Sequence, residues 1–292
     1  MLAQRRVQET ASVLLKFGAV ASLRRRMLRR RWGTASKLPA PPKCPKGWHV
    51  RPPTWVGVGV QKAGTTWWHS LIAAHPDVVM TSGLPKELHF FDRFWNQDLS
   101  KAETQLYAEY FCRPTGRAAG EWTPRYMFDP WTPALLRQAA PDARIIVLLR
   151  DPIERYRSGL SYDLERGGVF GPTLASIALT RGLYSQQMRR LRCNYPREQI
   201  LVLQYEKCSV EPTSELRRTY EFLRFENVGF LPRDLRSCVN RSRRSAFRVA
   251  DSVPDSILQI YEDDVSMLLE QCPGIDLSLW PNFAHMSSDT TS

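Results

Sequence analysis

Three short apolar segments constrain the fold of this chain more than any other feature of its sequence. Each is rich in aliphatic residues, and each is too short for a helix of ordinary length. The segments are Trp55–Val60, Arg144–Leu149 and Gln199–Gln204. Segments with helical character separate them, and this alternation is typical of a parallel sheet covered on both faces. The sequence therefore predicts an α/β fold, a parallel β-sheet flanked by helices.

Seven segments are expected to be helical, and one further segment is expected to be a strand. The helices are Thr65–Ala74, Glu103–Phe111, Thr132–Ala140, Ile153–Glu165, Thr173–Cys193, Pro212–Leu223 and Asp255–Gln271. The fifth of them is expected to break near Gly182, and the additional strand is Val78–Thr81. In such folds ligands bind at the carboxyl ends of the strands, where loops lead into helices.

The excess positive charge lies entirely at the N-terminus. The chain has 292 residues and a net charge of +12, and residues 1–51 hold thirteen basic residues against one acid. Residues 34–53, rich in Pro, Lys and Gly, are expected to be a linker. We expect three parts: a basic extension with its linker at 1–53, a folded domain at 54–284 and a tail at 285–292. Because the rest of the chain is neutral overall, its charge does not indicate nucleic-acid binding.

The apolar segment near the N-terminus is too short to cross a membrane. Residues 11–23 are interrupted by Lys16 and do not form a secretory signal, whereas a span needs about 20 apolar residues. The run RRRMLRRR at 24–31 follows directly. It is interpreted either as an amphipathic helix that contacts anionic lipid or as a solvated basic tail. We expect a cytoplasmic protein, with peripheral membrane contact as a property of this segment.

Six cysteines are spread along the chain without the spacing of a metal site. None forms C-x-x-C, and none has a histidine at zinc-like spacing. Free thiols in a reducing compartment are the favoured interpretation, and a Cys238–Cys272 bridge is the alternative. No metal site is expected.

A phosphate-binding loop is predicted where the first strand leads into the first helix. It runs from residue 61 to 67 as Q-K-A-G-T-T-W. A helix N-terminus presents free N–H groups, and Gly64 lets the backbone approach an anion closely. Thr65 and Thr66 add hydroxyl donors, and Lys62 adds a positive charge. The alternative is an ordinary turn capped by Thr65.

This loop differs from the Walker A loop, which places Lys directly after its second Gly. Here Lys62 precedes Gly64, and Arg150 rather than an acid follows the strand at 144–149. A magnesium-bound triphosphate is therefore not the expected ligand. A P-loop kinase nevertheless stays an alternative function.

Arg150 and Ser158 form a second expected anion site. Arg150 follows a strand at the ligand edge of the sheet, and Ser158 lies eight residues further on in the next helix. A planar guanidinium and a hydroxyl group together suit one phosphate. The alternative is an ion pair of Arg150 with Asp151 or Glu154 on a solvated face.

Glu87 and His89 form an expected acid–base pair. They alternate along an extended segment, so their side chains point to the same side. A carboxylate beside an imidazole takes a proton readily from a hydroxyl group. The alternative is a surface pair above a core made by Phe90 and Phe91.

These motifs together resemble those of sulfotransferases that use 3′-phosphoadenosine 5′-phosphosulfate (PAPS). Residues 61–67 resemble the family's loop for the 5′-phosphosulfate, and R-D-P-x-x-R-x-x-S from Arg150 to Ser158 resembles its 3′-phosphate signature. The resemblance covers roughly residues 54–284 and implies the P-loop-like sulfotransferase fold.

The resemblance also implies roles for single residues of the first loop. Lys62 would contact the 5′-phosphate and the bridging oxygen, and Gly64, Thr65 and Thr66, together with Ala63, would cradle the phosphate. Trp67 would stack on adenine, with core packing as the alternative. In a late basic loop, Arg243 and Arg244 would close the 3′-phosphate pocket, with a solvated turn as the alternative.

The string K-E-L-H-F-F-D, residues 86–92, resembles the heparan-type and bacterial carbohydrate sulfotransferases. That resemblance implies that Glu87 is the catalytic base, that His89 supports it, and that Lys86 contacts the sulfonate or the acceptor. Trp122 stands where these relatives carry a Lys that faces the acceptor. The change argues against a heparan-like acidic substrate and suggests stacking on a sugar or an aromatic acceptor.

The function implied is transfer of a sulfonate group from PAPS to a hydroxyl group of a carbohydrate, glycolipid or small-molecule acceptor, with Lys62, Glu87 and His89 at the reaction centre and without a metal. The rival from another class is a non-enzymatic basic protein that binds membrane or nucleic acid through residues 1–51. That hypothesis leaves the two anion loops unexplained, and no nucleic-acid partner is expected.

Overall fold

The structure is a computed structural model that describes residues 38–80, 83–169, 171–236 and 253–290. Several expectations therefore lie outside the described residues. They concern the apolar and basic segments at 11–31, Arg243 and Arg244 in the late basic loop, and Cys238.

Four parallel strands form the central sheet. They are β1 (Trp55–Gly59), β2 (Gly120–Trp122), β3 (Arg144–Leu149) and β4 (Ile200–Gln204), in the order β2-β1-β3-β4. The predicted α/β fold with a parallel sheet is confirmed. Every residue of β1 is buried, as its continuous apolar character predicts.

The edge strand β2 is the one that the apolar pattern does not predict. It has three residues, and one of them is the buried acid Glu121. The segment expected as a strand from Val78 makes only an isolated parallel bridge, between Val78 and Ala118. That part of the strand prediction was wrong. The Ala118 backbone N–H donates to the Asp77 carbonyl and the Val79 N–H donates to the Ala118 carbonyl, each at 2.8 Å, so the pairing is limited to this one bridge.

Ten α-helices are present in the described part of the chain. They are α2 (Thr65–Ala73), α3 (Lys101–Glu109), α4 (Arg125–Phe128), α5 (Thr132–Ala139), α6 (Pro152–Glu165), α7 (Pro172–Thr180), α8 (Tyr184–Asn194), α9 (Tyr205–Val210), α10 (Pro212–Leu223) and α11 (Asp255–Gln271). The predicted break near Gly182 falls between α7 and α8. A side chain at Gly182 would meet the Tyr261 ring, with its Cβ 2.6 Å from the hydroxyl oxygen.

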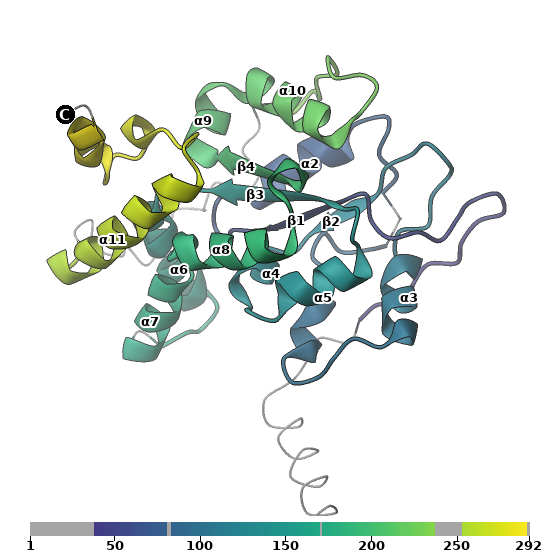
Figure 1. Cartoon of the computed structure of the whole chain (residues 1–292), viewed down its shortest axis with the longest axis horizontal. Helices are drawn as coiled ribbons and strands as arrows, with labels where there is room; N and C mark the ends of the chain where they lie inside the picture. The colour runs from purple at the N-terminus through teal and green to yellow at the C-terminus, as the bar shows by residue number, and fades with distance from the viewer. Residues whose placement is uncertain (1–37, 81–82, 170, 237–252, 291–292) are drawn as a thin grey trace, which may run out of the picture. The chain divides into compact units, whose positions relative to one another are not determined.

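Helices cover both faces of the sheet. Figure 1 shows α2, α9 and α10 on one side and α4, α5 and α8 on the other, with α6 and α7 beyond the arrowheads of β3 and β4. On the first side, the indole of Trp68 donates to Thr219 Oγ1 at 3.1 Å and Tyr220 donates to the Leu71 carbonyl at 3.2 Å, so α2 and α10 lie side by side.

The order of the strands places a ligand site after β1 and β3. The chain runs from β1 to its neighbour β2 and then crosses to β3 on the other side of β1. Such a switch point opens a crevice between the loops that follow the two central strands. These are the loops that carry Lys62–Thr66 and Arg150.

The segment before β1 belongs to the same compact unit as the sheet, a unit that starts at Pro39. A disulfide joins Cys44 to Cys112, whose Cα atoms are 5.7 Å apart. Backbone hydrogen bonds of 2.9 and 3.1 Å also pair His49 with Arg113. The prediction of free thiols was therefore wrong for this pair, and the cysteines no longer argue for a reducing compartment.

Cys272, one partner of the alternative bridge, is a free thiol in the core. The Nη2 of Arg192 lies 3.6 Å from the Cys272 Sγ. Cys193 is also free and is exposed, and Cys208 is free and buried.

Candidate active site

The loop between β1 and α2 has the backbone of an anion cradle. Lys62 and Gly64 both have positive φ angles, 72° and 83°, and Gly64 caps α2. A Cβ on Gly64 would lie 2.7 Å from the ring of Tyr205, so only glycine fits there. The free N–H groups of the first turn of α2 follow directly, at Thr65 and Thr66.

Two lysines add positive charge to this cradle. The Nζ of Lys86 donates to Thr65 Oγ1 at 3.1 Å and to Thr66 Oγ1 at 3.2 Å. The Nζ of Lys62 lies 4.1 Å above the ring of Tyr162. Burial is the main cause that lowers the pKa of both lysines. Partly desolvated ammonium groups beside a helix N-terminus favour binding of an anion.

Arg150, at the end of β3, reaches the same loop. Its Nη1 donates to the Lys62 carbonyl at 3.0 Å, and its Nη2 lies 3.7 Å from Glu154 Oε2. Its guanidinium also lies 5.2 Å from the centre of the Tyr205 ring. The structure thus brings together the two predicted anion-binding elements, and it also shows the Arg150–Glu154 pair that was the alternative. Ser158 is half-buried in the second turn of α6.

The start of α6 is fixed from two sides. Asp151 caps the helix, accepting from the backbone N–H groups of Ile153 and Glu154 at 2.9 and 3.2 Å. Its other oxygen accepts from the side-chain amide of Asn282 at 2.9 Å. The backbone N–H of Asp151 donates to Glu206 at 3.0 Å. This network holds the backbone next to Arg150 in one conformation.

Glu87 and His89 lie together, as the alternation predicts. The Nε2 of His89 is 3.3 Å from Glu87 Oε2, and its Nδ1 is 2.9 Å from Asp92 Oδ2. The hydrogen bonds to Asp92 and then to Glu87 raise the pKa of His89 to about 10. Burial acts to raise the pKa of Glu87, but the hydrogen bond from His89 and the charge of Lys86 outweigh it and lower this pKa. At neutral pH the site therefore holds an ionised Glu87 beside an imidazolium.

The buried carboxylate of Glu121 holds the backbone between these two residues. It accepts from the backbone N–H of Leu88 at 3.1 Å, from the hydroxyl of Tyr107 at 2.8 Å and from that of Thr123 at 2.6 Å. The hydroxyl of Tyr126 completes the set at 3.1 Å. Burial raises the pKa of Glu121, and these donors oppose the rise. The short strand β2 thus positions the segment that carries Glu87 and His89.

Trp122 corrects one sequence expectation. Its ring is fully buried and covers Gly57, where an added Cβ would lie 2.0 Å from the indole. Its Nε1 donates to the carbonyl of Gly59 at 3.2 Å. Stacking of Trp122 on an acceptor is therefore excluded, because both faces of the ring belong to the core.

Trp67 is also a core residue. Its side chain is 4% exposed, its Nε1 donates to the Leu235 carbonyl at 3.1 Å, and it packs edge-on against Trp68 and Tyr205. Trp67 therefore packs in the core, which was the alternative interpretation. The structure gives no support for its stacking on adenine.

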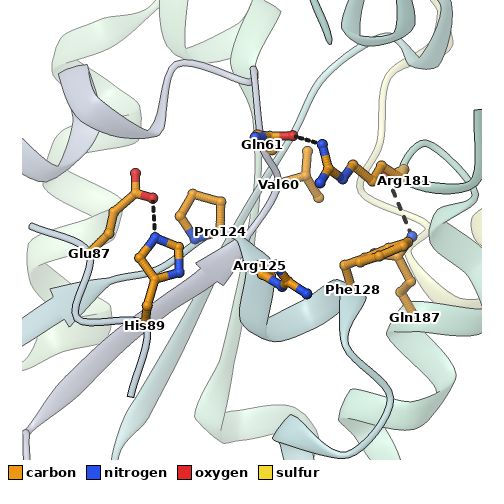
Figure 2. Close-up of a pocket in the computed structure, with 9 residues that line it drawn as sticks. All are labelled: Val60, Gln61, Glu87, His89, Pro124, Arg125, Phe128, Arg181 and Gln187. Carbon is orange, nitrogen blue, oxygen red and sulfur yellow. Dashed lines mark hydrogen bonds and ion pairs between the residues drawn. The ribbon is translucent and has the colours of Figure 1, made fainter. Parts of the chain in front are cut away.

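A cavity of about 130 Å³ adjoins Glu87 and His89. Its lining residues are Val60, Gln61, Glu87, His89, Pro124, Arg125, Phe128, Arg181 and Gln187. Figure 2 shows Glu87 and His89 on one side, and Arg181, Phe128 and Gln187 on the other. Because Gln61 directly precedes Lys62, the cavity lies next to the anion cradle. The sequence did not point to Phe128, Arg181 or Gln187, since they belong to no recognised motif.

Two features are absent from the described residues. Across 38–80, 83–169, 171–236 and 253–290, no group of three or more His, Cys, Asp or Glu side chains is arranged to hold a metal ion. Within the same ranges, no helix has both the length and the apolar character that a membrane crossing requires.

The fold and the site define an α/β protein with a phosphate-binding loop at its switch point and an acid–base pair beside it. The chain belongs to the sulfotransferase domain family, whose sequence profile matches residues 52–250. The resemblance inferred from the motifs is thereby confirmed.

Curated relatives are similar over part of their length. Mouse (Mus musculus) heparan sulfate glucosamine 3-O-sulfotransferase 3B1 is 26% identical over 193 residues, 60% of this chain and 47% of the relative. Human (Homo sapiens) heparan sulfate glucosamine 3-O-sulfotransferase 6 is 28% identical over 185 residues, 59% of this chain and 52% of the relative. This chain thus spans about half the length of the curated relatives it matches.

A solved structure shares the fold. The sulfotransferase from Alicyclobacillus acidocaldarius superposes with a TM-score of 0.61 at 22% identity, covering 78% of this chain and 98% of that one. The predicted P-loop-like sulfotransferase fold is therefore confirmed.

Proposed function

We propose that this protein transfers a sulfonate group from PAPS to a hydroxyl group of an acceptor, a carbohydrate or glycolipid. The observation that carries the proposal is the position of Lys86. Its Nζ contacts both hydroxyl groups of the donor loop and lies 3.0 Å from the carboxylate of Glu87. One side chain thus joins the anion cradle to the base, so a donor and an acceptor bound there would have their reacting groups close together.

The donor would lie across the two anion-binding elements. Lys62, Lys86 and the N-terminus of α2 would bind the 5′-phosphosulfate, and Ala63 and Gly64 would let it approach the backbone. Arg150 would bind the 3′-phosphate with Ser158. The contribution of Arg243 and Arg244 to that phosphate stays a prediction.

Glu87 would accept the proton of the acceptor hydroxyl group. The acceptor oxygen then forms a bond to sulfur, and the bond between sulfur and the 5′-phosphate oxygen breaks. The leaving group is 3′-phosphoadenosine 5′-phosphate (PAP), and Lys62 and Lys86 would stabilise its additional negative charge. His89 would keep Glu87 ionised and oriented, held by Asp92 in turn. The chemistry needs no metal, because charge stabilisation comes from lysines and backbone N–H groups.

The carbohydrate acceptor is supported by the names of the heparan sulfate relatives and by the polar side chains that line the cavity beside Glu87. Contact of residues 24–31 with anionic membrane is a separate proposal, which the membrane-associated sulfotransferase kil1 of Dictyostelium discoideum supports by likeness alone. That protein is 29% identical over 117 residues, 39% of this chain and 23% of its own length.

Two measurements test the proposed function. Incubation with ³⁵S-labelled PAPS and a panel of hydroxyl acceptors should give a labelled product, and PAP should raise the melting temperature more than ATP or duplex DNA does. Stabilisation by ATP with magnesium but not by PAP would instead favour the kinase alternative. Stabilisation by DNA alone would favour the non-enzymatic one.

A further inference from the structure

We propose that Arg181 binds an oxyanion group of the acceptor, so that the cavity selects hydroxyl compounds that also carry a carboxylate or similar group. The inference rests on the proposed function and names the acceptor class for the same site. It reverses the expectation drawn from Trp122, because Arg181 would supply the positive charge for an acidic acceptor that Trp122 does not. It begins from the position of Arg181 at the end of α7, opposite Glu87 and His89 across the cavity (Figure 2).

The position fits a two-point contact. An acceptor whose hydroxyl group meets Glu87 extends toward the opposite wall, where Arg181 and Phe128 lie. The ring of Phe128 offers an apolar surface beside the guanidinium, whose central carbon is 5.7 Å from the ring centre. A planar guanidinium beside an aromatic face is well suited to a carboxylate on a sugar-sized molecule.

The charge of Arg181 is less compensated than that of the other arginine in the cavity. Arg125 donates to Asp129 at 2.7 Å and has Asp92 at 3.7 Å as well. Arg181 donates instead to the uncharged side chain of Gln61 at 2.7 Å, and Asp163 approaches it only to 3.9 Å.

Because Arg181 is partly buried, the weak compensation of its charge favours binding of an anion. The side chain of Arg181 is 23% exposed, and burial is the main cause that lowers its pKa. A guanidinium that has lost much of its water, and whose short hydrogen bond goes to a neutral amide, gains from a charged oxygen.

The turn that presents Arg181 is rigid. The side-chain amide of Gln187 donates to the carbonyls of Leu183 at 2.6 Å, Thr180 at 3.3 Å and Arg181 at 3.4 Å. Gly182 packs against Tyr261 too closely for any side chain. These contacts hold the backbone that carries Arg181, and the hydrogen bond to Gln61 orients its guanidinium, which reduces the entropy lost on binding.

A matched pair of acceptors tests the inference. We would measure kcat/KM for sulfonate transfer to 4-nitrophenyl β-D-glucuronide and to 4-nitrophenyl β-D-glucoside, which differ at the sugar C6 as carboxylate and hydroxymethyl. The full chain should prefer the glucuronide by about ten- to a hundredfold, the size of a hydrogen bond to a charged group. Arg181→Gln should lose most of that preference while its rate on the glucoside changes little. Arg181→Lys should retain part of it.

Arg117→Gln is the matched control, because Arg117 pairs with Asp77 near the opposite end of the sheet and should leave the preference intact. Equal rates on both glycosides in the unchanged protein, or an equal loss on both in Arg181→Gln, would overturn the inference. So would transfer to other acceptors in the panel but to neither glycoside, an outcome that leaves the proposed function standing. PAP titration of each variant distinguishes failure of this inference from failure of the proposed function. Arg181→Gln should bind PAP about as tightly as the unchanged protein, and a collapse of its PAP affinity would overturn the inference by showing that Arg181 holds the donor loop through Gln61.

Discussion

His89 lies between two carboxylates, with Asp92 2.9 Å from Nδ1 and Glu87 3.3 Å from Nε2. The two acids make His89 an imidazolium with a pKa of about 10, and the imidazolium in turn lowers the pKa of Glu87. Asp92 therefore acts on the base through His89.

Asp92→Asn should narrow the pH profile of transfer. Without its strongest partner, the pKa of His89 falls, so the alkaline limb of kcat moves to lower pH. Glu87 then loses part of the charge that keeps it ionised, so the acid limb moves to higher pH. The measurement is kcat from about pH 5 to 10.5 in both proteins. Limbs that stay in place in the variant would show that Asp92 does not act through His89.

The same pair predicts a pH effect on stability. Because the pKa of His89 is raised in the folded state to about 10, from 6.5, its contribution to stability is complete below about 6.5 and is lost as pH rises through 10. The melting temperature of the unchanged protein should therefore fall more between pH 7 and 10 than that of His89→Gln. Parallel curves for the two proteins would contradict the imidazolium assignment.

Lys62 should serve the reaction more than the fold. Its Nζ rests on Tyr162, and a partly desolvated contact of this kind contributes about 1–2 kcal/mol. Lys62→Ala should lower turnover by orders of magnitude with a small change in melting temperature. Lys101→Ala is the control, because Lys101 begins α3 and is exposed. Near-normal turnover of a folded Lys62→Ala protein would refute this role.

Arg150 should distinguish PAP from AMP, which lacks the 3′-phosphate. Arg150→Ala should weaken PAP binding by about ten- to a hundredfold while AMP affinity changes little. Ser158→Ala should have a smaller effect in the same direction. Arg150 also bonds to the Lys62 carbonyl. If both nucleotides weaken equally, the arginine holds the donor loop rather than binding the 3′-phosphate. Isothermal titration with each nucleotide decides between the two.

Much of the fold follows from local sequence, because apolar runs and capping residues act over short distances. The strand β3 and the helices α10 and α11 begin and end where the sequence predicts. The elements that were missed are short. Strand β2 contains a buried acid, and α9 follows β4 without an intervening turn, so neither gives a periodic signal.

The residues of the site also fall into two groups: those that a local motif identifies and those that only the fold brings together. The motifs identify Lys62, Glu87 and Arg150 because each lies in a continuous string of residues with one chemical purpose. Arg181 comes from a turn 94 residues after Glu87, and only the packing of α7 against α6 brings it to the cavity. Likewise, the spacing of Cys44 and Cys112 carries no information, because their approach depends on how the segment before β1 folds back.

The most direct test of the proposed function is the Glu87→Gln variant, measured for transfer and for PAP binding in the same preparation. Glutamine keeps the shape of the side chain and, through its one carbonyl oxygen, one of the two contacts to Lys86 and His89, but it cannot accept a proton from the acceptor. Transfer should fall by about a hundred- to ten-thousandfold, and PAP affinity should stay within about threefold. Transfer within tenfold of the unchanged protein, or a collapse of PAP affinity, would contradict the role of Glu87 as the base.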